Sequence, residues 1–291
     1  MKVLYATDGG EPAAAAATLI EALGSRRSVE VTVMSVTRLD PYSPEILLPG
    51  GDAVTRGAVR AEDVASAGAR QLSDAGFQVQ TRVGIGPPGR RIVEMATAEP
   101  YDLVVVGAGN HRWLGTLLLG STSTYVLHHS PIPVLIVHEP PRRPMPLRVL
   151  IATDGSPEAV GAASTLGAFA DPVRCRVTAF SVAQMPVMST VPPSLVAGLP
   201  SHPDIMATLV DDAEKAAEAV AEPLRERGFQ VDTVATDGAA HHLIVRECEE
   251  GGYDLTVVGS RGLGRVPGAV LGSVSQAVAR HARAALIGRM A

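Results

Sequence analysis

Short apolar segments alternate along the chain with longer segments in which apolar residues recur at helical spacing. The short segments predict strands and the longer ones predict helices. In the first half, the predicted strands are 3–6, 29–36, 77–83, 101–106 and 133–137, and the predicted helices are 11–23, 58–75, 90–98 and 121–129. In the second half, the strands are 147–152, 174–182, 229–235, 253–258 and 284–287, and the helices begin near 157, 204, 239 and 276. This alternation predicts an α/β fold with parallel sheets and right-handed crossovers.

The order of elements repeats because the chain carries the same motifs twice. GAGN at 107–110 and GSTS at 120–123 recur as GSRG at 259–262 and GSVS at 272–275, with nine residues between the two parts of each motif. ATDG at 6–9 likewise recurs at 152–155. We therefore predict two tandem Rossmann-like, doubly wound domains, residues 1–139 and 147–291, joined by a stiff proline-rich linker at 140–146.

Each glycine motif follows an apolar strand and precedes a helix, which is the geometry that binds phosphate. Glycine lets the backbone approach an anion, and the amides of the first helical turn point at it along a favourable dipole. Neither motif contains the lysine of a GxxxxGK[ST] P-loop. Asp8 and Asp154 follow the first strand of each unit, so they face the same crevice as Gly107 and Gly259 if the first and fourth strands are neighbours.

Composition narrows the classes of partner. The net charge of −5 argues against a general nucleic-acid or membrane-surface binder. A hydrophobic content of 46% with only 3% aromatic residues fits aliphatic cores under helix-covered sheets. Cys175 and Cys248 are isolated and lack metal-ligand spacing. Met1 leads into the first strand without an apolar signal core, so we expect a soluble, cytoplasmic protein.

The duplicated motif resembles the ATP-binding signature of the universal stress protein family, which is glycine, two residues, glycine, nine residues, glycine and serine or threonine. Gly259, Gly262, Gly272 and Ser273 match it fully, and the resemblance covers essentially the whole chain. It implies a tandem member with a five-stranded parallel sheet of order 3-2-1-4-5 in each domain. It also implies ATP at the switch point, accompanied by Mg²⁺, with no side chain assigned as a metal ligand or a catalytic group.

The same resemblance implies which residues contact the nucleotide: the aspartate and the valine lie near the adenine and ribose, and the glycine motif lines the ribose and phosphates. In the second unit these residues are Asp154, Val182, Gly259, Ser260, Gly262, Gly272, Ser273, Val274 and Ser275. In the first unit they are Asp8, Val36, Gly107, Ala108, Gly120, Ser121, Thr122 and Ser123.

The first unit departs from the signature at Asn110, where the family has glycine. Asparagine visits left-handed conformations more readily than most residues, so the turn can form, but its side chain can obstruct a phosphate near the backbone. Gly10 stands where the second unit has Ser156 and therefore lacks a capping hydroxyl. These differences predict tighter ATP binding in the second unit.

Other features are weighed against simpler explanations. GIGPPG at 84–89 matches a dinucleotide fingerprint, but it follows the third strand and contains two prolines, which favours a stiff turn over an NAD site. The adjacent histidines at 128–129 and 241–242 diverge by about 100° on a helix, so neither pair can chelate one ion from one face. Asp8 and Asp154 could cap helices as well as contact a ligand.

The expected function is that of an ATP-binding stress-response sensor or adaptor. ATP would order the proline-rich loops 37–54 and 183–203 and change the surface offered to a protein partner of unknown identity. The alternatives are a slow ATPase or nucleotidyl-transfer enzyme and an interaction module with vestigial sites. Efficient turnover is not indicated, because the loops lack a lysine and paired bases.

Unpaired sheet edges are a liability, so the fifth strands should pair within the chain. The resemblance further implies a homodimer.

Overall fold

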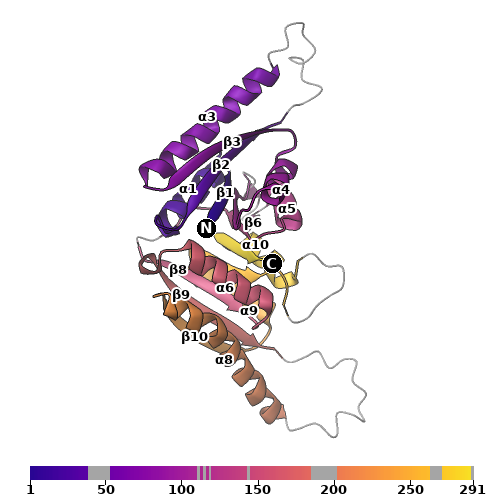
Figure 1. The fold of residues 1–291 in the computed structure, drawn as a ribbon. Coiled ribbons are helices and arrows are strands. Elements are labelled where there is room, and N and C mark those ends of the chain that lie inside the picture. Colours follow the sequence, from indigo (N-terminus) through magenta and orange to yellow (C-terminus); the bar gives the residue numbers. More distant parts are fainter. Residues whose placement is uncertain are drawn as a thin grey trace.

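The computed structural model describes residues 1–38, 53–109, 112–113, 116–117, 119–142, 145–184, 202–262 and 271–289 (Figure 1). The main elements of the first unit are β1 (Lys2–Ala6), α1 (Glu11–Leu23), β2 (Glu30–Thr37), α3 (Ala53–Asp74), β3 (Gln78–Ile85), α4 (Pro88–Ala98), β4 (Leu103–Gly107), α5 (Ser121–His129) and β7 (Val134–Val137). Those of the second unit are β8 (Leu147–Thr153), α6 (Pro157–Phe169), β9 (Cys175–Ala183), α8 (His202–Glu226), β10 (Gln230–Asp237), α9 (Ala240–Glu250), β11 (Leu255–Gly259), α10 (Ser273–His281) and β12 (Ala284–Gly288). A short 3₁₀ helix, η1 (Pro172–Arg174), precedes β9.

The described strands of both units join in one 10-stranded sheet, in the order β10-β9-β8-β11-β12-β7-β4-β1-β2-β3. Each half therefore has the order 3-2-1-4-5 with parallel neighbours, which confirms the predicted fold class. The two halves meet where β7 pairs with β12 antiparallel, with Leu135 opposite Leu286. The expectation that the fifth strands pair within the chain is thus confirmed.

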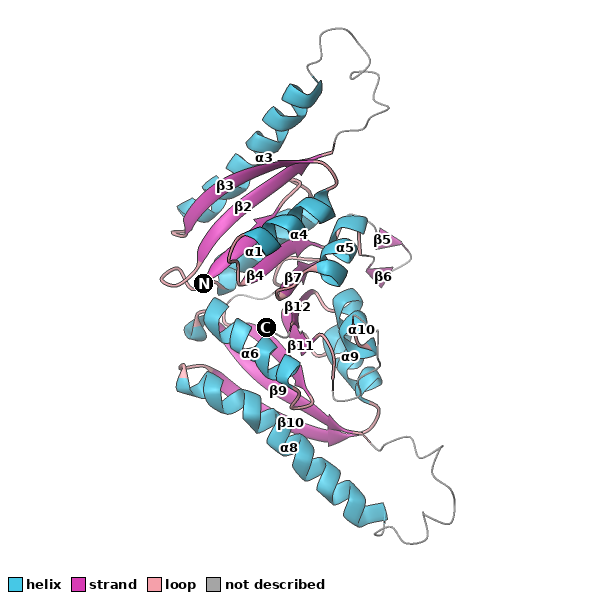
Figure 2. Ribbon diagram, turned by 45° about the vertical axis from the view of Figure 1, so that its right-hand side comes forward, coloured by secondary structure: helices cyan, strands magenta, loops and turns pink. Residues whose placement is uncertain are grey.

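Helices cover both faces of the sheet (Figure 2). On one face α1 packs on β4 and β7 while α6 packs on β11 and β12, and on the other face α5 packs on β7 and α10 on β12. This double cover explains why β7 and β12 consist of apolar or small residues that are buried throughout. The outer strands β3 and β10 are covered less completely, and their burial patterns are mostly exposed.

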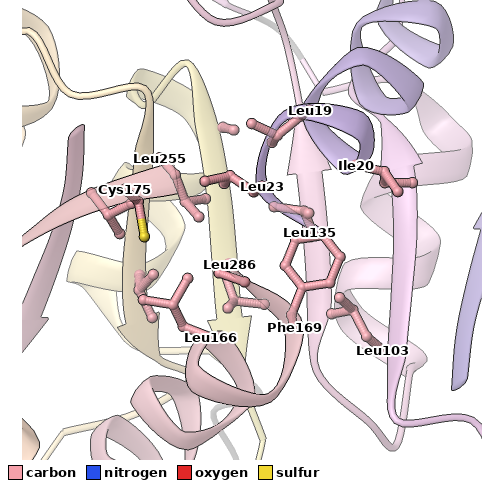
Figure 3. Packing of buried hydrophobic residues seen from close by; sticks show 14 of the residues in the cluster. Leu19, Ile20, Leu23, Leu103, Leu135, Leu166, Phe169, Cys175, Leu255 and Leu286 are labelled. Atoms are coloured by element: carbon pink, nitrogen blue, oxygen red, sulfur yellow. The ribbon is translucent and has the colours of Figure 1, made fainter. Parts of the chain in front are cut away.

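The hydrophobic core runs through the junction between the two units (Figure 3). Phe169 at the end of α6 is 1% exposed and belongs to the same cluster as Leu23 of α1 and Leu135 of β7. Beside this cluster, the Asp171 amide donates to the Leu23 carbonyl (2.7 Å) and the Ser25 amide donates to the Phe169 carbonyl (2.9 Å). These two bonds are equivalent when the units are exchanged, so the junction has approximate two-fold symmetry.

An aspartate before the fourth strand of each unit holds the backbone of the first strand. Asp254 is 2% exposed, and its carboxylate accepts the amides of Arg142 (3.0 Å) and Arg148 (3.1 Å). Asp102, its exposed counterpart, accepts the Lys2 amide at 2.7 Å. Asp254 therefore attaches the linker, at Arg142, and the second residue of β8 to the fourth strand of the second unit.

We expect Asp254→Ala to lower the free energy of unfolding by about 1.5–3 kcal/mol, because it removes a charged acceptor from two amides. Asp102→Ala is the matched control and should cost about 1 kcal/mol, since a single, more exposed bond is lost. Urea denaturation of the two variants measures both values. A larger loss for Asp102→Ala would contradict this account of the linker.

The structure also contains elements that the sequence patterns did not predict. Between the two parts of the first glycine motif, β5 (Arg112–Trp113) and β6 (Thr116–Leu117) form a two-stranded antiparallel hairpin, and β6 lies against α10 of the other unit. Helix α10 begins at Ser273 rather than at the predicted residue 276.

Some predictions fall on residues that the structure does not describe. These are most of the two proposed loop lids, Asn110, and residues 263–270 of the second motif. Among the described helices, none has the length and apolar character needed to cross a bilayer.

Candidate functional site

The glycine motifs lie at the point where the strand order reverses. In the first unit β1 has β2 on one side and β4 on the other, and in the second unit β8 has β9 and β11 as its neighbours. Ligands of open α/β sheets bind beyond the strand ends at such a switch point. Asp8 after β1 and Gly107 at the end of β4 therefore lie at the carboxyl ends of neighbouring strands. The same holds for Asp154 and Gly259 in the second unit.

The first glycine of each motif permits close packing between the strand end and a helix start. A Cβ atom on Gly107 would lie 2.6 Å from the backbone nitrogen of Ala13 in α1. A Cβ atom on Gly259 would lie 2.8 Å from the corresponding nitrogen of Ala159 in α6. Real Cβ atoms do not approach backbone this closely, so only glycine fits at these two positions.

A repeated set of hydrogen bonds closes each glycine loop onto its helix. In the second unit the Gly272 amide donates to the Ser260 carbonyl (2.8 Å), and the Ser275 hydroxyl lies 2.9 Å from the same carbonyl oxygen. In the first unit the Gly120 amide and the Ser123 hydroxyl both meet the Ala108 carbonyl, at 2.5 and 2.8 Å.

The buried serines of these loops have a structural role. Ser123 and Ser275 are 1% and 3% exposed, and their hydroxyls also lie near the carbonyls of Gly120 and Gly272. Ser275 is among the residues that the resemblance places near the nucleotide, but its hydroxyl is directed at carbonyls of the loop itself.

The residue after each strand end is likewise held within the fold. The Ala108 amide donates to the Val137 carbonyl (2.8 Å) and the Ser260 amide donates to the Gly288 carbonyl (3.0 Å). Ala108 and Ser260 are buried at 0% and 4% exposure. These residues connect the glycine loop to the fifth strand, so the Ala108 and Ser260 amides are not directed at a ligand.

The first turns of α5 and α10 are open to an anion. Their N-cap residues are Gly120 and Gly272, so no side chain caps either helix, and neither first turn contains an acidic residue. The first amides of a helix lack intrahelical acceptors and carry the positive end of the dipole. Ser121 and Ser273, which begin the helices, are exposed. Amides in this arrangement can accept a phosphate group, and phosphate binding at these two helix starts stays a prediction.

The aspartate and the second glycine of the motif lie in contact in the second unit. The Asp154 carboxylate accepts the Ser156 amide at 3.0 Å through Oδ1. A Cβ atom on Gly262 would lie 2.3 Å from Asp154 Oδ2, so a side chain at 262 would displace this carboxylate. Asp8 accepts the Gly10 amide in the same way (2.9 Å). The aspartate and the described start of the glycine loop therefore lie together in the second unit.

The second unit has an additional connection between its helix start and its glycine loop. The Ser156 hydroxyl lies 3.4 Å from the Ala159 amide, which it caps, and 3.4 Å from the carbonyl oxygen of Arg261. The N-cap of α1 is Gly10, which makes no side-chain capping bond. Gly10 therefore has no hydroxyl with which to make the corresponding contact to the first glycine loop.

The valines assigned to the adenine lie at the ends of the second strands. Val36 in β2 and Val182 in β9 are half-buried and pack against the apolar cluster on the α4, α5, α9 and α10 side of the sheet. They are one strand away from the aspartates, since β2 pairs with β1 and β9 with β8. Their contact with a base stays a prediction.

The glycine run at 84–89 is explained by packing and turn geometry. Gly86 has a φ of 131°, which favours glycine, and its amide donates to the Thr37 carbonyl at 3.0 Å. A Cβ atom on Gly89 would lie 2.8 Å from the Cβ of Tyr125, where α4 packs on α5. These constraints account for Gly86 and Gly89 without a dinucleotide.

His129, His241 and His242 have ring partners, and both cysteines are buried. His129 stacks on Tyr125 with 4.0 Å between ring centroids, and His241 and His242 meet edge to face at 5.6 Å. Burial raises the pKa of the Cys175 thiol to about 12 and that of Cys248 to about 11, so both are protonated. Within the described ranges, no three His, Cys, Asp or Glu residues gather as a metal site would require.

Two polar residues next to the site loops were not assigned by sequence reasoning. His138 follows β7, whose last carbonyl binds the first glycine loop, and Arg289 follows β12, whose last carbonyl binds the second. Aligning the two halves would place His138 and Arg289 at equivalent positions. Their different side chains conceal this equivalence in the sequence.

Fold and site together define a tandem Rossmann-like α/β protein in which each unit presents a glycine loop and an uncapped helix start at the switch point. The sequence profile of the Universal stress protein family matches residues 1–138 and again 145–287. The chain belongs to the universal stress protein family.

Individual relatives agree with this assignment. A universal stress protein of Mycolicibacterium smegmatis is 30% identical over 214 residues, which cover 71% of this chain and 67% of the relative. One of Mycobacterium bovis is 28% identical over 301 residues, covering 98% of this chain and 95% of its own. Among solved structures, a universal stress protein of Archaeoglobus fulgidus superimposes with a TM-score of 0.68 at 22% identity, over 99% of this chain and 98% of that one, which shows a shared fold.

Proposed function

We propose that this protein binds ATP at the glycine loops of both units and acts as a nucleotide-dependent sensor or adaptor in a stress response. The observation that carries the proposal is the pair of helix starts at Ser121 and Ser273, each capped by glycine and free of acidic residues in its first turn. Amides and the helix dipole can hold a phosphate chain in such a place without a lysine. Membership of the family supports a nucleotide as the ligand, and our proposal is that this nucleotide is ATP accompanied by Mg²⁺.

The second unit is expected to bind ATP more tightly than the first. The Ser156 hydroxyl contacts the Arg261 carbonyl and Asp154 lies against Gly262, so the described start of this loop has contacts that need no ligand. A site that needs less ordering on binding retains more of its interaction free energy. The first unit lacks the capping contact at Gly10.

We further propose that nucleotide binding, rather than turnover, is the function. Phosphoryl transfer requires a positioned nucleophile and charge stabilisation at the transferred group. At the described part of the second site the carboxylate is Asp154, which accepts the Ser156 amide, and it is the group available to assist a slow hydrolysis. A slow ATPase is the second candidate function because Asp154 lies beside the glycine loop of the second unit.

The direct test is to denature protein that was purified without added nucleotide and to identify what is released. We expect ATP or ADP in the supernatant, and calorimetric titration of the emptied protein with ATP and Mg²⁺ should show two unequal sites. Phosphate release over many turnovers should be near background and unchanged in Asp154→Ala. A chain that releases no nucleotide and gives no heat with ATP would overturn the proposal, and rapid turnover abolished in Asp154→Ala would favour the enzyme.

A further inference from the structure

Helices α5 and α10 each end at a side chain from the opposite unit. His138, directly after β7, donates its Nε2–H to the Ala279 carbonyl near the end of α10 (2.8 Å). Arg289, directly after β12, donates a guanidinium N–H to the Leu127 carbonyl near the end of α5. The two contacts correspond to each other when the units are exchanged. The antiparallel pairing of β7 with β12 places each strand end beside the other unit's helix end.

These two carbonyls need a donor from outside their own helix. The last carbonyls of a helix have no intrahelical amide. The Ala282 amide satisfies Val278, and the Ser130 amide satisfies Val126, so the carbonyl that follows in each helix is left to another donor. Leu127 and Ala279 are 2% and 0% exposed, so the donors that reach them from the other unit replace water.

Helices α5 and α10 each begin at the candidate site of their own unit. Each ends beside the strand end that binds the glycine loop of the other unit. The N-terminus of α10 at Ser273 belongs to the second site, and its C-terminal end meets His138. The residue before His138 is Val137, whose carbonyl accepts the Ala108 amide of the first glycine loop. By the same arrangement α5 extends from the first site to Arg289, which follows the carbonyl that accepts the Ser260 amide.

The two donors differ in charge. Burial lowers the pKa of the His138 imidazole, and its acceptor is a carbonyl, so Nε2 carries the proton of a neutral ring. Arg289 brings a positive charge to the negative end of α5, which adds to the favourable interaction of that helix with an anion at its N-terminus. Burial and the nearby charge of Arg261 lower the pKa of the Arg289 guanidinium.

We propose that His138 and Arg289 are positioning residues for the nucleotide site of the opposite unit, so that each site is completed by a side chain of the other unit. His138 holds α10 and serves the second site, and Arg289 holds α5 and serves the first. This inference rests on the proposed ATP binding, because positioning has a function only if the helix starts bind a ligand.

The test compares the two sites one at a time in the full chain. In a Gly120→Glu background ATP titration reports the second site, and in a Gly272→Glu background it reports the first. We expect His138→Ala to weaken the second site by about three- to tenfold, the fold-change that the loss of a single hydrogen bond produces, and to change the first site less than twofold. Arg289→Ala should show the opposite pattern. His138→Gln and Arg289→Lys, which retain a donor, should restore most of the affinity.

A second measurement separates failure of this inference from failure of the proposed function. Amide hydrogen exchange without nucleotide should become faster in α10 for His138→Ala and in α5 for Arg289→Ala. If His138→Ala does not fold, His138→Leu removes the donor while keeping the volume filled. The inference would be overturned if either variant weakened the site of its own unit, as loss of the Arg289 charge near Arg261 could do in the second unit. Equal loss of affinity at both sites would also overturn it. Faster hydrogen exchange in the helix of the other unit, with ATP affinities unchanged, would overturn the inference and show that both residues are structural contacts only. A parent chain that binds no ATP would overturn the proposed function itself.

Discussion

Replacing Gly272 by glutamate should weaken ATP binding at the second site by at least about a hundredfold, since like charges placed face to face cost several kcal/mol. Gly272 is the N-cap of α10, with a φ of −74° that any residue adopts. A Cβ atom there meets its nearest neighbour, the Ser275 hydroxyl oxygen, at 3.5 Å, which is an ordinary contact. The glutamate can therefore be accommodated, and its carboxylate lies where the phosphates would bind.

Gly272→Ala is the matched control for this experiment. It adds the same Cβ without the charge, so we expect its ATP affinity to stay within about threefold of the parent chain. The preference of the cap position for glycine over alanine lowers the stability of α10 but places no negative charge beside the phosphates. Calorimetric titration of both variants, with thermal unfolding to show that each is folded, completes the comparison. Equal losses for alanine and glutamate would mean that backbone conformation, rather than charge, controls the site.

The corresponding change in the first unit, Gly120→Glu, tests the inequality of the sites. A Cβ atom on Gly120 lies 3.2 Å from the Ala108 carbonyl oxygen, so this position is tighter than Gly272. If the second unit contributes most of the ATP binding, Gly120→Glu should remove the smaller part of the total heat. A greater loss from Gly120→Glu than from Gly272→Glu would contradict the order of affinities that we propose.

The second large effect concerns the first glycine of each motif. Gly107→Ala and Gly259→Ala should each lower the free energy of unfolding by about 3 kcal/mol, the upper part of the range for overpacking, because the new methyl meets backbone that cannot rotate away. The methyl would lie 2.6 Å from the Ala13 nitrogen in the first case and 2.8 Å from the Ala159 nitrogen in the second. Urea denaturation measures the loss.

Gly161→Ala within α6 provides the control for these two substitutions. A Cβ atom at Gly161 has its nearest neighbour, the Arg289 carbonyl oxygen, at 3.7 Å. Alanine is the better helix former by about 1 kcal/mol, so this variant should be slightly more stable than the parent. If Gly107→Ala were as stable as the parent chain, the close contact between β4 and α1 would not be the reason for glycine at this position.

Much of the architecture could be predicted because local patterns agree with the global fold. The repeated glycine motif located both strand ends at the switch point, and the contact between Asp154 and Gly262 places these two residues together as expected. The pairing of β7 with β12 followed from the general rule that sheet edges are avoided. The order of strands depended on the family resemblance and not on periodicity alone.

Other parts of the site could not be predicted because they depend on three-dimensional packing. The sequence shows that Ser275 has a hydroxyl, but only the folded loop shows that it is directed at the Ser260 carbonyl. The hairpin β5–β6 arises within a segment without strong apolar alternation. The contact of His138 with Ala279 joins residues 141 positions apart in different units, a separation at which no local pattern carries information.

The antiparallel seam between β7 and β12 has a consequence for the evolution of the two halves. Separate chains that met through the same surface would have identical halves, and every change would appear in both of them. Covalent linkage fixes the ratio of the two halves at one to one and lets each half accumulate its own substitutions. Examples are Asn110, which corresponds to Gly262 in the sequence of the second half, and Gly10, which corresponds to Ser156. The molecule can therefore keep one half as a dedicated receptor while the other half diverges, without risk of assembling mismatched copies.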